Sequence, residues 1–178
     1  MTAESKGTKQ VLAQSLKELM NERSFLKISV GDICTHCGMS RKSFYYHFQD
    51  KYDLMNWIFY TEFAATLQLP AEISSQQLLL NICSYFHKEQ AFYRNALSVN
   101  GQNSFQEYFV DVIQPFIHAF VLEMFDESQD IHFFVTFYTD AFLSAIIRWL
   151  NEGTPIPPQQ FAYLLEKAVG RSSMPALS

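Results

Sequence analysis

The chain has 178 residues, of which 48% are hydrophobic and 17% are charged, and its formal net charge is −5. This length and apolar content exclude a disordered chain and fit one domain, or a small head on a larger body. As a single sum, the charge argues against a nucleic-acid partner. However, residues 1–51 carry eight Lys and Arg against five Asp and Glu, whereas residues 52–178 carry five against thirteen. A basic segment on an acidic body is typical of a chain whose basic part meets a charged partner.

The first part of the chain has the pattern of three helices. Residues 8–22 repeat apolar side chains at helical spacing, which predicts an amphipathic helix. The apolar face of this helix consists of Leu12, Leu16, Leu19 and Met20. Ser29 stands three residues before an aspartate, which is the spacing of a capping box, and is expected to open a short helix. This helix is expected to end at Gly38, because glycine tolerates a left-handed turn. Ser40 is the expected N-cap of a third helix over residues 41–47.

The rest of the chain is also helical by pattern. Asp50 is the expected N-cap of a fourth helix, which runs from about residue 51 to 68, and Pro70 marks a boundary. Beyond this boundary the predicted helices cover about 74–89, 91–99, 103–124, 129–152 and 158–169. Pro115 falls inside one of them and predicts a kink or a break there.

These patterns predict an all-α fold of about nine helices. The chain holds only six Gly and six Pro, and we find no sustained strand alternation with hairpin turns. A three-helix head is expected in residues 1–50, followed by a linking helix over about 50–68. Residues 70–178 are expected to form an α-helical body.

The second and third helices have the helix-turn-helix pattern of two short helices joined by a glycine turn. In this pattern the first helix lies against the phosphate backbone and the second enters the major groove. Arginine and lysine donate to guanine edges or phosphates, and hydroxyl and imidazole groups reach phosphates or base edges. Lys51 stands at a helix N-terminus, which itself favours a phosphate. The residues predicted to contact DNA are Ser29, Ser40, Arg41, Lys42, Ser43, Tyr45, Tyr46, His47 and Lys51.

The run from Ile33 to Lys51, ICTHCGMSRKSFYYHFQDK, resembles the DNA-binding signature of TetR-family transcriptional regulators. Both have a turn of small residues with glycine, then two aromatic residues, histidine and phenylalanine, and a lysine shortly afterwards. The resemblance covers about residues 8–60. Cys34 and Cys37 stand where alanine is common in the family, a change that we expect the packing to accept.

Residues 51–60, KYDLMNWIFY, and the segment 142–153 are similar to a subgroup that includes activators of dihydroxyacetone kinase operons. The family resemblance implies a homodimer that pairs through its last two helices. Two heads about one helical turn apart, roughly 34–36 Å, would bind a palindromic operator. The residues implied at the dimer interface are Ala141, Phe142, Ser144, Ala145, Trp149, Phe161, Leu164 and Leu165.

The body is rich in phenylalanine, and two interpretations of these side chains stay open. Their helical spacing favours core packing, whereas some of them are expected to line an effector pocket between helices. Polar residues of the body would then determine specificity, although each of them alone has a solvated or structural role as its alternative. The residues predicted for the pocket are His87, Arg94, Phe105, Phe109, Phe116, His118, Phe137 and Asp140.

Other functions find little support in the sequence. Cys34 and Cys37 form a C-x-x-C motif, but no second ligand pair is near, so we interpret them as small core residues and expect no metal. Enzyme motifs such as G-x-S-x-G and H-E-x-x-H are missing, so we expect neither an enzyme nor a cofactor. The N-terminal residues lack the apolar stretch of a signal peptide and no uncharged run spans a bilayer, so we expect a cytoplasmic protein without membrane contact.

The sequence therefore predicts a homodimeric, sequence-specific DNA-binding regulator whose C-terminal domain senses an effector and dimerises. The effector is either a small molecule or a protein. Repression follows if the effector and DNA favour different spacings of the two heads, and activation follows if they favour the same spacing. The alternative is a protein-interaction module or a coactivator-dependent activator, in which the acidic aromatic body binds a partner protein.

Overall fold

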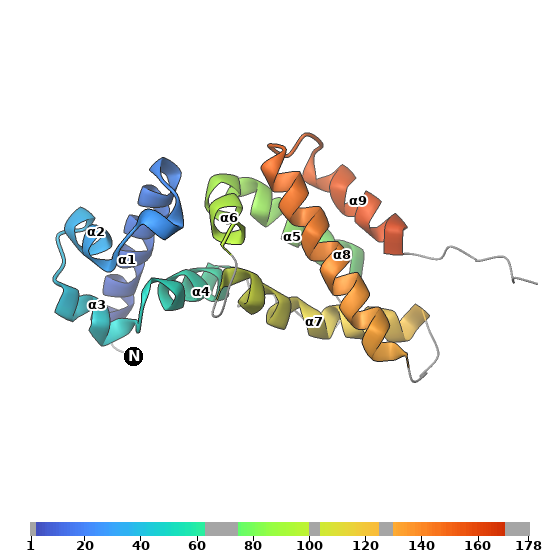
Figure 1. The fold of residues 1–178 in the computed structure, drawn as a ribbon, viewed down its shortest axis with the longest axis horizontal. Helices are drawn as coiled ribbons and strands as arrows, with labels where there is room; N and C mark the ends of the chain where they lie inside the picture. Colours follow the sequence, from blue (N-terminus) through green and yellow to red (C-terminus); the bar gives the residue numbers. More distant parts are fainter. Residues whose placement is uncertain (1–2, 63–74, 100–103, 125–129, 170–178) are drawn as a thin grey trace, which may run out of the picture. The chain divides into compact units, whose positions relative to one another are not determined.

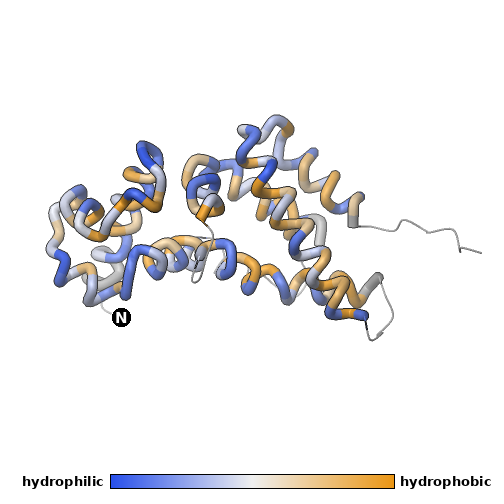
Figure 2. Tube along the Cα trace, viewed as in Figure 1, coloured by the Kyte–Doolittle hydropathy of each residue, from blue (hydrophilic) through white to orange (hydrophobic). Residues whose placement is uncertain are grey.

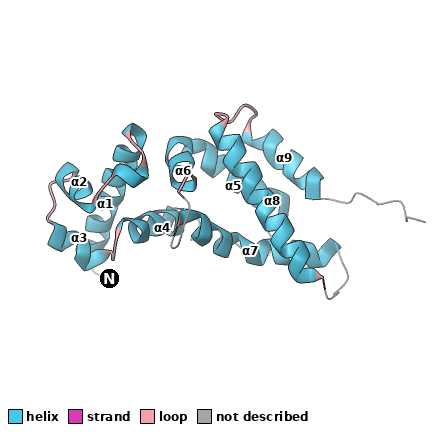
Figure 3. Cartoon of the chain, viewed as in Figure 1, coloured by secondary structure: helices cyan, strands magenta, loops and turns pink. Residues whose placement is uncertain are grey.

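The computed structural model describes residues 3–62, 75–99, 104–124 and 130–169, and the regular elements in these ranges are all helical (Figures 1 and 3). The all-α prediction is confirmed. The helices are α1 (Ala3–Glu22), η1 (Phe25–Lys27), α2 (Val30–His36), α3 (Arg41–His47), α4 (Lys51–Glu62), α5 (Ser75–Lys88), α6 (Gln90–Leu97), α7 (Phe105–Met124), α8 (Ile131–Asn151) and α9 (Pro158–Val169). The 3-10 helix η1 is the one element of this set that the sequence patterns did not indicate.

The chain divides into two compact units. Unit 1 comprises residues 1–68 and 89–109, and unit 2 comprises residues 69–88 and 110–178. Helix α6 and the first turn of α7 thus belong with the predicted head by packing. Packing units and functional domains are different divisions, so the predicted domain boundaries remain predictions.

The core of unit 1 is built on the predicted apolar face of α1. Leu12 and Leu16 of this face have no exposed surface, and neither has Phe25 of η1. A cluster of aromatic rings extends this core: Phe59 of α4 makes edge-to-face contacts with Tyr93 of α6 at 6.1 Å between ring centroids, and with three rings of α7. Such pairs add roughly 0.5–1.5 kcal/mol each beyond the burial of their area. The aromatic residues in the first turn of α7 are therefore part of the core of unit 1.

Unit 2 holds α5, most of α7, α8 and α9. Figure 2 shows that apolar residues recur along α7 and α8. Helix α8 ends in a Schellman motif: Gly153 has φ +79°, and the N–H groups of Gly153 and Thr154 donate to the carbonyls of Leu150 and Trp149. The indole ring of Trp149 then stacks on Phe161 of α9 at 4.5 Å between centroids. These contacts confirm the predicted end of the long helix at Gly153.

Two features of the long helices modify the sequence predictions. Helix α7 continues through Pro115, so the chain does not break there, although proline removes one backbone hydrogen bond. Helix α8 is long and apolar enough to cross a membrane by length and composition, with a mean hydropathy of 1.3, and 33% of its most apolar stretch is buried. Core helices of soluble proteins meet the same criterion, and α8 carries Asp140 and Arg148, so this is weak evidence for a membrane span.

Candidate nucleic-acid interface

Helices α2 and α3 are joined by a turn whose geometry follows from local sequence. Gly38 has φ +69°, a left-handed conformation that favours glycine. The N–H groups of Gly38 and Met39 donate to the carbonyls of Thr35 and Cys34 at 3.3 and 2.9 Å, which closes the C-terminus of α2. The predicted helix-turn-helix therefore forms, with the turn where the glycine stands.

The N-termini of both helices are capped by serine, as predicted. The Ser29 hydroxyl accepts a hydrogen bond from the Asp32 N–H at 3.1 Å, while the Asp32 carboxylate accepts from the Ser29 N–H at 2.8 Å, which is a complete capping box. The hydrogen bonds from Ser29, together with the charge of Arg23, lower the pKa of Asp32. Ser40 caps α3 by accepting from the Ser43 N–H at 3.1 Å. If Ser29 and Ser40 contact DNA as predicted, their hydroxyl groups must do so while they also cap these two helices.

One face of α3 anchors the helix in unit 1. Phe44 is fully buried, Phe48 is 3% exposed, and their rings lie 5.8 Å apart. The ring of Phe48 also contacts Trp57 of α4 at 5.7 Å, and the Lys9 ammonium lies 5.0 Å from the Phe48 ring centroid. These contacts hold the orientation of α3 because its buried face has partners from α1 and α4.

The opposite face of α3 is open to solvent. Arg41 and Lys42 are exposed, Tyr45 is 58% exposed and Tyr46 is 83% exposed, whereas Ser43 and His47 are half-buried. A shallow hollow on this face is lined by Ser40, Lys42, Ser43, Tyr45 and Tyr46. Two cations and two phenol groups on one exposed helix face are the donors that phosphates and base edges accept from.

The Arg41 side chain lies back over the first turn of α2, against Gly31. A Cβ atom built at Gly31 would lie 3.2 Å from Cζ and 3.3 Å from Nε of Arg41, and would clash with its Nη2. The absence of a side chain at Gly31 therefore leaves the space that the guanidinium occupies. No sequence pattern indicated this role for Gly31, since it depends on the packing of α3 against α2.

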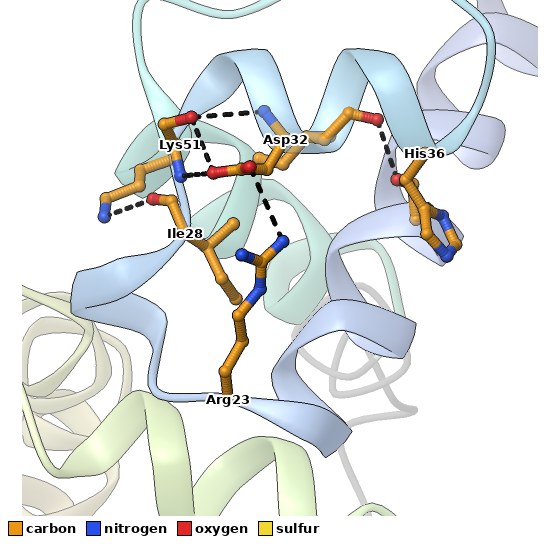
Figure 4. Close-up of polar contacts among 8 residues, drawn as sticks. Arg23, Ile28, Asp32, His36 and Lys51 are labelled. Carbon is orange, nitrogen blue, oxygen red and sulfur yellow. Dashed lines mark hydrogen bonds and ion pairs between the residues drawn. The ribbon is translucent and has the colours of Figure 1, made fainter.

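The structure gives Lys51 a different contact from the one predicted. Its ammonium donates to the backbone carbonyls of Phe25 at 2.8 Å, Leu26 at 3.3 Å and Ile28 at 2.7 Å, as Figure 4 shows for Ile28. An ammonium has three N–H donors, so these three acceptors use all of them. Burial lowers the pKa of Lys51, whereas the negative charges of Asp32 and Asp50 act in the opposite direction. The ammonium thus fastens η1 to the start of α4 and has no donor left for a phosphate.

Residues 14–57 match the family of bacterial regulatory proteins named tetR, and residues 74–170 match a family described as the transcriptional regulator C-terminal region, of the TetR type. The chain belongs to the TetR family. It is a DNA-binding transcriptional regulator and not an enzyme, as the sequence predicted.

Three known proteins are similar to this chain in sequence or in fold. The chain is 26% identical over 148 residues to the HTH-type dhaKLM operon transcriptional activator DhaS of Lactococcus lactis, covering 79% of this chain and 78% of DhaS. The solved structure of a dihydroxyacetone kinase operon activator DhaS matches with a TM-score of 0.65 at 21% identity, over 91% of this chain and 93% of that chain. A TetR transcriptional regulator of Streptococcus agalactiae matches with a TM-score of 0.75 at 19% identity, over 94% of this chain and 96% of that chain. The predicted similarity to regulators of dihydroxyacetone kinase operons is confirmed.

The eight residues predicted for an effector pocket do not lie together. Phe105 and Phe109 are fully buried in the aromatic cluster of unit 1, because the first turn of α7 packs there. Phe116 and Phe137 line a cavity of about 330 Å³ in unit 2. The remaining four are exposed and do not line this cavity: His87, Arg94, His118 and Asp140. Helical spacing predicts that the aromatic residues share one face of α7. It does not show that the first turn of α7 packs in unit 1 and the rest of the helix in unit 2.

The residues predicted at the dimer interface divide into two groups. Four are buried within the chain and have little surface to offer a partner, because they pack between α8, α9 and their neighbours: Phe142, Trp149, Phe161 and Leu165. Ala141, Ser144 and Leu164 are exposed, and Ala145 is half-buried. Four of the eight also line the 330 Å³ cavity: Ala141, Phe142, Ala145 and Leu165. The dimer interface stays a prediction.

The three cysteines are free thiols. Cys34 and Cys83 are buried, and Cys37 is half-buried, with its Sγ 3.7 Å from the carbonyl oxygen of Cys34. Burial raises the pKa of Cys34, and it raises the pKa of Cys83 to about 12. Within the part of the chain that the structure describes, no group of three or more His, Cys, Asp or Glu could hold a metal ion.

Proposed function

We propose that the chain acts as a homodimer that binds a palindromic operator with α3 in the major groove, and that its C-terminal region responds to an effector. The observation that carries the proposal is the division of α3 into a buried face and an exposed face with Arg41 and Lys42. A recognition helix needs both, because the buried face determines its direction and the exposed face meets the bases.

Charge supports the same orientation. Residues 1–51 carry a net +3, and the remaining residues carry −8. The acidic part is repelled by phosphates, so the field of the protein favours an approach with residues 1–51 towards DNA. The modest positive charge implies weak non-specific binding, so specificity depends on two heads engaging two half-sites together.

The proposal is tested on the DNA next to the protein's own gene, by footprinting and then by gel shift. Arg41→Ala and Lys42→Ala should each weaken operator binding by about 1–3 kcal/mol if the side chain reads a base, or should lower the salt dependence by about one unit if it contacts a phosphate. Lys88→Ala on α5 removes the same charge from an exposed helix end and serves as the control. Unchanged binding in both α3 variants would refute the proposed reading surface.

Two further measurements address the dimer and the operator. Light scattering of the purified chain should give twice the mass of 20.7 kDa. The footprint should contain two half-sites whose centres are about 10–10.5 base pairs, or a multiple of this spacing, apart. A monomer in solution with a single unsymmetrical site would contradict the homodimer.

A second candidate function is activation together with a partner protein. Its support is the 26% identity to a relative named as an operon activator, and the pair of exposed aromatic residues Phe133 and Phe137 on α8, which are 64% and 55% exposed and stack at 6.2 Å. A reporter assay distinguishes activation from repression: deletion of the gene should lower the expression of an activated target and raise that of a repressed one. We infer that either activity takes place in the cytoplasm, where the operator is.

A further inference from the structure

The last turn of α2 carries the two cysteines of the C-x-x-C motif. Cys34 lies within α2, and Cys37 is the C-cap, whose N–H donates to the Ile33 carbonyl at 3.2 Å. Because this hydrogen bond continues the helical turn to Cys37, the two side chains stand three residues apart on one face of the helix. The Cys37 thiol turns back towards the other cysteine and donates to the Cys34 carbonyl, with Sγ and O 3.7 Å apart.

The two thiols differ in exposure. Cys34 is 3% exposed and fills a core position, whereas Cys37 is half-buried. A dissolved oxidant therefore reaches Cys37 first, and Cys34 lies behind it. The third cysteine, Cys83, is buried in unit 2 and is not open to exchange with either of them. An accessible thiol with a second thiol one helical turn away is the arrangement in which a sulfenic acid condenses to a disulfide.

The pair interacts electrostatically with the proposed reading helix. Burial has the largest effect on the pKa of Cys34 and raises it, a negative charge on Cys37 raises it further, and the guanidinium of Arg41 lowers it. Because the interaction of charges declines with distance, these effects place both sulfurs and Arg41 close to one another. The buried Cys34 is the slower nucleophile, so Cys37 is the thiol that reacts first.

A disulfide between these residues requires the end of α2 to move. Side chains three residues apart on a helix have Cβ atoms about 5–6 Å apart, whereas a disulfide needs about 3.5–4.5 Å. Cys37 must therefore approach Cys34 by about 1 Å or more. The Met39 N–H, which belongs to the turn after α2, donates to the carbonyl of Cys34 at 2.9 Å. Closure of the disulfide thus displaces the turn that leads into α3.

We propose that Cys34 and Cys37 form a reversible disulfide when the chain meets a hydroperoxide, and that this disulfide weakens operator binding by displacing α3. The inference rests on the proposed function, because it regulates the operator binding assigned to α3. In a compartment that keeps thiols reduced, a disulfide is transient and is typical of catalysis or of redox sensing.

The reaction balances in two steps. The Cys37 thiolate attacks the hydroperoxide ROOH, so that an S–O bond forms, the O–O bond breaks, and RO⁻ leaves and takes up the proton that Cys37 had lost. The Cys34 thiol then attacks the sulfur of this sulfenic acid, so that the S–S bond forms, the S–O bond breaks, and water leaves with the proton of Cys34. The two thiols lose two electrons, and the peroxide gains them. Dithiothreitol reverses the change by thiol–disulfide exchange.

The first test is peptide mapping of the full-length chain before and after treatment with hydrogen peroxide. Trypsin releases residues 28–41 as one peptide, because the chain has no Lys or Arg between Lys27 and Arg41. After oxidation, this peptide should be lighter by about 2 Da, and dithiothreitol should restore its mass. Two free thiols in the treated peptide, or a gain of about 16 Da on Met39 without the disulfide, would overturn the proposal.

Gel shifts with the operator measure the consequence for DNA binding. Oxidation should weaken binding by the natural chain about tenfold or more, since the loss of one base contact already has an effect of this size, and dithiothreitol should restore it. Cys37→Ser should keep its binding in peroxide, whereas Cys83→Ala, the matched control, should respond like the natural chain. Unchanged binding by a chain that carries the disulfide would contradict the switch, as would an equal loss in Cys37→Ser.

A second variant keeps the test decisive if Cys37→Ser does not fold by circular dichroism. Cys34→Ala also lacks the disulfide and should keep its operator binding in peroxide, while dimedone should label its Cys37 as a sulfenic acid. Loss of binding in a folded Cys34→Ala to the same extent as in the natural chain would assign the effect to another group and overturn the proposal.

The same experiments show which of the two proposals fails. If the peptide 28–41 acquires the disulfide but neither the reduced nor the oxidised chain binds an operator, the proposed function fails and the disulfide stands as chemistry alone. If the natural chain binds its operator and loses this binding in Arg41→Ala, but peroxide leaves the peptide reduced, the DNA-binding function stands and the redox inference fails.

Discussion

We expect the side chain of Asn95 to connect α6 to the end of α1 and to η1 within unit 1. Its side-chain carbonyl accepts from the Phe25 N–H at 2.8 Å, and its amide donates to the carbonyls of Met20 at 3.0 Å and Arg23 at 2.8 Å. One amide therefore closes the C-terminus of α1 and the start of η1. The three partners lie 70 to 75 residues away in the chain.

Asn95→Ala removes all three hydrogen bonds at once. A hydrogen bond contributes about 0.5–1.5 kcal/mol net, and partly buried groups that lose their partner cost more, so the free energy of unfolding should fall by about 2–4 kcal/mol. Urea denaturation followed by circular dichroism at one fixed protein concentration measures this change, since a dimer's stability depends on concentration.

Arg94→Ala on the same helix is the matched control. Arg94 is exposed, so its removal should change the unfolding free energy by less than about 0.5 kcal/mol. If Asn95→Ala also stays within this limit, the amide does not carry the connection and the reasoning fails. Asn95→Asp sharpens the test: it keeps the acceptor for Phe25 but points a carboxylate at two carbonyls, so it should destabilise the chain at pH 7 at least as much as Asn95→Ala.

Three further predictions concern single side chains. Lys51→Met should lower the unfolding free energy by about 1–3 kcal/mol at pH 7, because three carbonyls lose their donor. Burial lowers the pKa of Lys51 below 10.5, so the unfolded chain binds this proton more strongly than the folded chain does. The natural chain should therefore gain stability relative to the variant as the pH rises towards 10.5. Gly31→Ala should weaken operator binding several-fold in gel shifts by displacing the guanidinium of α3, whereas Gly7→Ala, with nothing within 4 Å, should not. A thiol reagent at pH 8 should label Cys37 first and leave Cys83 unmodified until the chain is denatured, because burial raises the pKa of Cys83 to about 12; rapid loss of a thiol in Cys37→Ser would contradict this.

The sequence by itself determined the helix-turn-helix and most helix boundaries. Ser29, Gly38 and Ser40 act on backbone groups within five residues of themselves, so the pattern of residue types is sufficient to locate the turn and both helix starts. The same holds for Gly153 at the end of α8. Local signals of this kind are independent of the rest of the fold, which is why the predicted limits of α3, 41–47, agree with the structure.

Tertiary structure alone decided where side chains with distant partners point. The ammonium of Lys51 has charge and position suited to a phosphate, but its carbonyl acceptors lie 23 to 26 residues earlier in the chain. Phe105 and Phe116 share a helix face by spacing, yet the first packs in unit 1 and the second lines the cavity of unit 2. Periodicity tells which side of a helix is apolar but not which neighbour covers it, because that depends on the arrangement of elements far apart in the chain.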